Sequence, residues 1–119
     1  MTTPDDHQRR FERVDVQLRT IYHDEIDADE SDSLMSNLSQ GGCYIRTPRV
    51  LPSGSTIHVK FKVPGLDVTV EAVGSVRWAN DSGPTESRGM GVQFTEISQD
   101  ALLILKQYIA GQLESSLLW

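Results

Sequence analysis

Hydrophobic and polar residues alternate in several short runs along this chain, which is the pattern of half-buried β-strands. In the clearest run, residues 56–63, apolar side chains fill every second position and histidine or lysine lies between them. The same alternation predicts a strand at 14–22, and we also predict strands at 34–38, where the pattern is weak, and at 43–47, 68–78 and 89–94. Gly74 lies inside the strand predicted at 68–78 and indicates a bulge there.

The spacing of the apolar residues changes near residue 98. Apolar residues recur at helical spacing from Leu102 to Leu113. Ser98 is a suitable N-cap, and Asp100 would lie in the first turn, where the helix dipole favours a negative charge. We therefore predict a helix over residues 98–118. Short strands at regular spacing followed by one helix favour an all-β barrel or sandwich that the helix covers.

The chain has 119 residues, enough for one domain with its own core. We divide it into a flexible polar tail at 1–8 and a single domain at 9–119. No apolar run approaches the roughly 20 residues that a membrane span needs, and the polar start of the chain has no signal-peptide pattern. The single cysteine, Cys43, cannot form an intrachain disulfide and is expected to be a small buried residue. These features predict a cytoplasmic protein with no membrane insertion.

The formal net charge of −6 comes from one segment. Residues 24–33 contain six of the 17 acidic residues and no basic residue, so the remaining 11 acidic residues balance the 11 basic ones. We expect this segment to be a solvated acidic loop that discourages edge pairing or binds a basic partner. The balance elsewhere argues against binding to a nucleic acid polymer, which needs a broad positive surface.

Two short motifs could bind a small anion instead. Arg9, Arg10 and Arg13 lie within five residues, and guanidinium groups bind phosphate oxygens and the guanine O6/N7 edge at two points. The second motif is Asn37-x-Ser39-x-x-Gly42, in which two polar side chains share a strand face and a glycine lets the chain turn. Taken singly, the first motif is also typical of a solvated basic patch and the second of an ordinary hairpin turn.

Together the two motifs resemble those of the PilZ domain family. Residues 91–94 resemble a weaker signature of that family, and residues 37–47 resemble PilZ domains of the myxobacterial type. The resemblance covers about residues 8–110. It implies a six-stranded antiparallel β-barrel with a C-terminal helix, and a bacterial cytoplasmic receptor for the second messenger cyclic di-GMP.

The resemblance also implies a binding site for cyclic di-GMP. Its members would be three arginines, two polar residues, a glycine that leaves room for the ligand and a tryptophan that offers its ring to a purine: Arg9, Arg10, Arg13, Asn37, Ser39, Gly42 and Trp78. Gln8 stands where an arginine accompanies a stacked pair of ligand molecules in the family, so it favours one bound molecule. A tryptophan at position 78 is also typical of core or rim packing.

No pattern in the sequence predicts catalysis or a metal site. Ser39 lacks the preceding glycine and the following helix of a nucleophile elbow. The acidic segment fails as an EF-hand loop because Asp32 and Leu38 stand where that loop needs glycine and glutamate. The chain has no Cys-x-x-Cys and no paired histidine spacing for zinc. We therefore expect neither an enzyme nor a metalloprotein.

The expected function is that of a cyclic di-GMP receptor or adaptor that signals through protein–protein contacts. The candidate contact surfaces are the acidic loop and the end of the helix with Leu117, Leu118 and Trp119, which could also support a homodimer. The alternative is a nucleotide-independent adaptor of the same fold, which would use the barrel for protein contacts in motility or pilus regulation.

Overall fold

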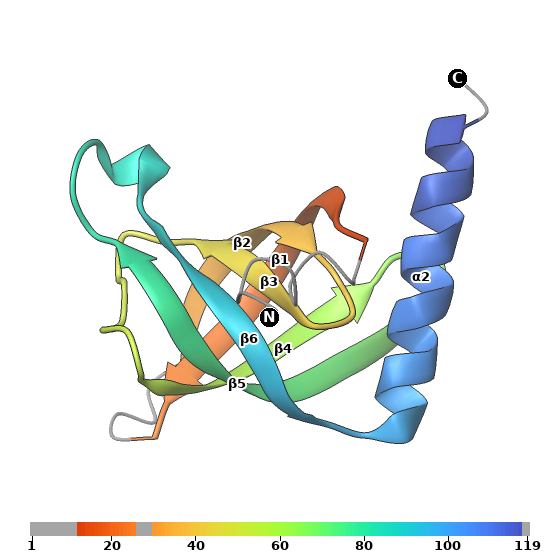
Figure 1. Ribbon diagram of the computed structural model, residues 1–119, viewed down its shortest axis with the longest axis horizontal. Helices are drawn as coiled ribbons and strands as arrows, with labels where there is room; N and C mark the ends of the chain where they lie inside the picture. The colour runs from red at the N-terminus through yellow and green to blue at the C-terminus, as the bar shows by residue number, and fades with distance from the viewer. Residues whose placement is uncertain (1–11, 26–29, 118–119) are drawn as a thin grey trace, which may run out of the picture.

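Six antiparallel strands form a closed barrel in the computed structural model, and one long helix lies beside it (Figure 1). The structure describes residues 12–25 and 30–117, with side chains up to residue 114. The elements in chain order are β1 (Val14–Asp24), β2 (Ser31–Leu38), β3 (Gly42–Arg46), β4 (Thr56–Val63), β5 (Val68–Asn80), a short 3-10 helix η1 (Thr85–Ser87), β6 (Gly89–Ile97) and α2 (Gln99–Leu117). The strands pair around the barrel in the order β1-β2-β3-β6-β5-β4. The predicted barrel with a C-terminal helix is confirmed.

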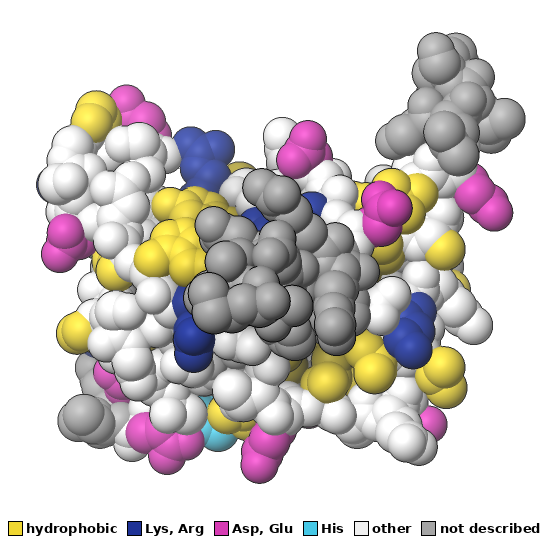
Figure 2. All heavy atoms as spheres, in the orientation of Figure 1, with side chains coloured by type: hydrophobic (Ala, Val, Ile, Leu, Met, Phe, Trp, Pro, Cys, Tyr) yellow, Lys and Arg dark blue, Asp and Glu magenta, His cyan; other side chains and the backbone are white. Residues whose placement is uncertain are grey.

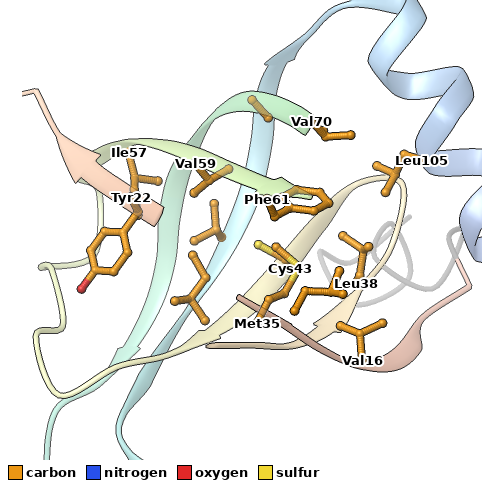
Figure 3. Packing of buried hydrophobic residues seen from close by; sticks show 14 of the residues in the cluster. Val16, Tyr22, Met35, Leu38, Cys43, Ile57, Val59, Phe61, Val70 and Leu105 are labelled. Carbon is orange, nitrogen blue, oxygen red and sulfur yellow. The ribbon is translucent and has the colours of Figure 1, made fainter. Parts of the chain in front are cut away.

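The interior of the barrel is filled by the apolar face of each strand. In β4, Ile57, Val59, Phe61 and Val63 are all at most 2% exposed. Figure 3 shows three of these side chains pointing inward toward Met35 and Leu38 of β2. Each fully buried aliphatic or aromatic side chain contributes about 1.5–3 kcal/mol to stability. Because the barrel closes, each of the six strands has a hydrogen-bonded neighbour on both sides over at least part of its length.

The helix α2 packs against the barrel through β5 and β1. Ser98 caps it: the Ala101 N–H donates to Ser98 Oγ at 3.1 Å, and the Leu102 N–H donates to the Ser98 carbonyl at 2.9 Å. Leu105 and Ile109 are buried, and Figure 3 shows Leu105 reaching the core near Phe61. Leu103, on the other side of the helix, is 57% exposed. None of the helices in the described ranges has the length and apolar character to cross a membrane.

The acidic segment is less of a loop than its composition suggests. β1 continues through Asp24 and β2 already begins at Ser31, so only residues 25–30 connect them. The strand predicted at 34–38 was therefore three residues too short at its start. The reason is that residues 31–33 are all polar and lie at partly or fully exposed positions, so they carry no hydrophobic alternation.

Candidate functional site

A pocket on the outside of the barrel collects residues from five parts of the chain. Arg13 directly precedes β1, and Ser39 and Gly41 belong to the turn between β2 and β3. The other lining residues come from β3, β5 and β6: Gly42, Cys43, Tyr44, Arg77, Trp78, Val92 and Gln93. These elements meet because β6 lies between β3 and β5 in the barrel. Four residues predicted from the sequence, Arg13, Ser39, Gly42 and Trp78, therefore line one pocket.

Two aromatic rings stand over glycines of β6. Gly91 is opposite Tyr44 on one side and opposite Trp78 on the other. A Cβ atom on Gly91 would overlap the indole ring of Trp78, and a Cβ atom on Gly89 would lie 2.6 Å from Cε1 of Tyr44. Both rings thus cover backbone that has no side chain. Trp78 is still 41% exposed, so it is a surface residue and not part of the core.

The turn that borders the pocket is held by its own hydrogen bonds. The Ser39 N–H donates to the Gly42 carbonyl at 2.8 Å, and the Ser39 hydroxyl donates to the same carbonyl at 3.3 Å. The Gly41 N–H in turn donates to Ser39 Oγ at 3.1 Å. Ser39 is only 6% exposed. A hydroxyl oxygen has two lone pairs, so Ser39 can accept one further hydrogen bond while the turn stays intact.

Gly42 is required by the packing of the turn against β6. A Cβ atom at this position would overlap the carbonyl oxygen of Val92 on the paired strand. Cys43, the next residue, is buried inside the barrel as predicted (Figure 3). Burial raises the pKa of the Cys43 thiol to about 12, so at neutral pH it is protonated and unreactive.

The described residues give the pocket a positive charge. Arg13 and Arg77 are both exposed and both line it, whereas no aspartate or glutamate of residues 12–25 and 30–114 does. Figure 2 shows hydrophobic side chains next to basic ones on this face of the barrel. Within the described part of the chain, neither guanidinium group makes a hydrogen bond or ion pair. Free guanidinium forks beside an exposed aromatic ring suit an anion that carries a planar base.

Comparison with protein families settles where the chain belongs. The model of the PilZ domain matches residues 7–111, which is most of the sequence. The chain belongs to the PilZ domain family. PilZ domains are receptor or adaptor domains for cyclic di-GMP rather than enzymes, and nothing in the described residues of this one indicates catalysis.

Solved structures of PilZ proteins have the same fold. The Bacillus subtilis inhibitor of motility MotI/DgrA is 25% identical with a TM-score of 0.70, over 89% of this chain and 52% of its own. The PilZ domain of Escherichia coli YcgR, solved with c-di-GMP, is 14% identical with a TM-score of 0.68, over 92% of this chain and 94% of its own. Borreliella burgdorferi PlzA, in complex with c-di-GMP, is 14% identical with a TM-score of 0.52, over 82% of this chain and 39% of its own.

This PilZ domain therefore spans about half the length of MotI/DgrA and less of PlzA. No curated protein sequence matches it significantly.

The other residues predicted from the PilZ motifs do not line the pocket in the described part of the chain. Arg9 and Arg10 lie outside the described residues. Asn37 is half-buried and does not line the pocket, but its backbone is paired with Tyr44, which does. Asn37 thus lies one strand away from the pocket. That any of the predicted residues contacts a nucleotide remains a prediction.

Three of the polar side chains that line the pocket, Tyr44, Arg77 and Gln93, were not among the site residues predicted from the sequence. Tyr44 and Gln93 lie in strands that the sequence predicts, but nothing in the alternation shows that β3 and β6 are neighbours. Arg77 was missed for another reason. In a regular strand it would face away from Trp78, whereas the pairing of β5 with β6 shifts register between Val76 and Trp78. The irregularity predicted at Gly74 is present as a separate register shift between Val73 and Gly74, but the extra residue there is Thr95 of β6, not a residue of β5.

The described residues also contain no group of three or more potential metal ligands.

Proposed function

We propose that this chain is a bacterial cytoplasmic receptor that binds cyclic di-GMP in the pocket of Arg13, Ser39, Gly42 and Trp78 and signals through protein–protein contacts. The observation that carries the proposal is that residues of both PilZ motifs meet in one positively charged pocket. A basic patch and a hairpin turn with unrelated roles would have no reason to share a pocket with an exposed indole ring.

The chemistry of the ligand fits this pocket. Cyclic di-GMP carries two phosphodiester charges and two guanine bases. The free guanidinium groups of Arg13 and Arg77 offer charge-assisted hydrogen bonds to phosphate or guanine acceptors. Each such bond is worth about 1.5–3 kcal/mol. Several of them, less the free energy lost in ordering side chains, support binding at the micromolar level, about 8 kcal/mol.

Two features guide the choice of contact surface for a protein partner. The helix α2 leaves Leu103 57% exposed, and in Figure 1 its C-terminal half extends beyond the barrel. The acidic residues Glu25, Glu30 and Asp32 lie on the exposed surface around the β1–β2 connection. A chain ending at Glu114 tests the helix: we expect it to keep cyclic di-GMP binding and lose the partner or the dimer, as measured by pull-down and size-exclusion chromatography.

The second candidate is a PilZ adaptor that does not bind nucleotide. The hydrogen bonds of Ser39 are compatible with this adaptor, because they give the second motif a structural role in the turn that needs no ligand. Calorimetric titration of the purified chain with cyclic di-GMP at fixed salt separates the two functions. The receptor predicts saturable heat with a dissociation constant in the micromolar range, whereas the adaptor predicts no heat even at about 100 µM ligand, roughly 5.5 kcal/mol of binding free energy.

A further inference from the structure

The bulge in β5 turns two consecutive side chains to the same side of the barrel. Val76 is opposite Val92 and Trp78 is opposite Gly91, so two steps along β5 match one step along β6. Val76 faces the core at 1% exposure, while Arg77 and Trp78 are both exposed and both line the pocket. A strand without this bulge would have directed only one of the two outward.

The backbone at the bulge is pinned by the loop before β4. Pairing of β5 with β4 ends at Ser75, and three hydrogen bonds from Ser53–Ser55 continue it. The Gly54 N–H donates to the Val76 carbonyl at 2.7 Å, the Val76 N–H donates to the Ser55 carbonyl at 2.9 Å, and the Ser53 hydroxyl donates to the Arg77 carbonyl at 2.9 Å. Arg77 is thus presented from a fixed backbone, which lowers the entropy lost when its side chain binds.

The pair of side chains has the composition of a base-reading site. One face of the Trp78 indole covers the backbone of Gly91, which leaves the exposed remainder of the ring as a platform for a base. The edge of a base stacked there falls within reach of the neighbouring long side chain, Arg77. The O6/N7 edge of guanine offers two acceptors to a guanidinium fork, whereas the same edge of adenine offers one acceptor and one donor.

We propose that Arg77 is a specificity-determining residue that reads the guanine edge of the base stacked on Trp78. This inference rests on the proposed function, and it adds the guanidinium group of Arg77, from β5, to that of Arg13. It predicts that the domain selects cyclic di-GMP over cyclic di-AMP largely through one side chain.

The test is calorimetric titration of the full chain and its variants with cyclic di-GMP and cyclic di-AMP at one salt concentration. The parent binds cyclic di-GMP more tightly. Arg77→Gln lowers the affinity for cyclic di-GMP by about tenfold or more and that for cyclic di-AMP by less than about threefold, as expected for loss of a two-point contact to guanine. Arg77→Lys keeps the charge but behaves like Arg77→Gln, because lysine has no planar fork.

Arg46→Gln is the matched control. Arg46 projects outward from β3 two residues from Tyr44, it is exposed, and it donates to the Glu86 carbonyl instead of lining the pocket. We expect this variant to lose less than about threefold in affinity for either nucleotide, since it removes the same charge without removing a contact to the nucleotide.

Three results would overturn the inference while leaving the proposed function standing: an Arg77→Gln affinity equal to the parent's, an equal loss for both nucleotides, or an equal loss in Arg46→Gln. A parent chain that binds neither nucleotide would overturn the proposed function and this subsite with it. Arg77 is exposed, so its variants should fold, and circular dichroism confirms that each one does.

Discussion

The acidic segment and the pocket differ in whether their charges already have partners. On the acidic side, Asp32 pairs with Arg19 at 2.5 Å, Glu25 with His58 at 2.8 Å and Glu30 with Lys60 at 3.1 Å. In the pocket, Arg13 and Arg77 have no such partner within the described part of the chain. The segment that dominates the formal charge is therefore partly neutralised, and the few free cations lie elsewhere.

The formal charge of a sequence segment is therefore a poor guide to where an ion binds. The ion pairs of the acidic segment are solvent-exposed, and such pairs add little to stability. They still occupy the donors of Arg19 and Lys60, which would otherwise compete for an anion. A guanidinium group without a partner keeps all its donors for a ligand. Arg13 and Arg77 thus matter more for binding than the six acidic residues of the segment.

We expect the largest effect on ligand binding, from a comparison of Arg13 in the pocket with Arg19, which pairs with the acidic segment. Arg13→Ala removes a charge-assisted contact from the pocket and should weaken cyclic di-GMP binding by about 10- to 100-fold, equivalent to about 1.5–3 kcal/mol. Arg19→Ala removes an arginine that is already paired with Asp32, and it should change the affinity by less than about twofold. Titration calorimetry measures both. Equal losses in the two variants would mean that the distinction between paired and free arginines has no bearing on binding.

The next largest effect should be on stability, and it tests the close packing of Gly42 against β6. Gly42→Ala places a Cβ atom against the Val92 carbonyl oxygen, so β3 and β6 must move apart at a cost of about 1–3 kcal/mol. Thermal unfolding should show a Tm several degrees lower. The control is Gly111→Ala, because a Cβ atom there meets nothing within 4 Å and alanine favours the helix by about 1 kcal/mol. If Gly42→Ala is as stable as the parent, the glycine is not required by packing.

The smallest effect concerns the acidic segment itself. The hydrogen bond and charge of Arg19 lower the pKa of Asp32. The stability from this pair is present at pH values above the usual pKa of an aspartate, and it is lost as the pH falls through the lowered pKa of the folded state. Asp32→Asn should therefore reduce the Tm slightly at pH 7 and low salt, with a difference that shrinks as the pH falls through the lowered pKa of Asp32 and that is smaller at about 1 M salt, where charges are screened. A difference that grows toward low pH would contradict this assignment.

The sequence predicted the barrel because the hydrophobic alternation is strong where only one face of a strand is buried. β4 has the bounds that were predicted, since Ile57 to Val63 alternate without a break. The start of β2 was missed because Ser31 to Ser33 are polar on both faces. A strand can thus form by pairing alone at the rim of a barrel, and alternation cannot detect it.

The site was predictable only in part, and the reason is the register of β5. Arg13, Ser39 and Gly42 were found through their family motifs, which are local in sequence. Arg77 belongs to no motif, and the stretch of β5 that bulges, Val76 to Trp78, contains no glycine that would have indicated the bulge. Its position depends on hydrogen bonds to Ser53–Ser55, more than 20 residues away in the chain. Such tertiary pairing leaves no signal in a single sequence.

We propose that Arg13 and Arg77, and not the acidic segment, mark where cyclic di-GMP binds. An NMR titration of the isotope-labelled chain with cyclic di-GMP tests this proposal. The largest shifts should fall on the backbone amides of Gly41, Gly42 and Gln93 and on the indole N–H of Trp78, with the amides of Glu25 and His58 unchanged. Shifts centred on Glu25 and His58, or none at saturating ligand, would contradict it.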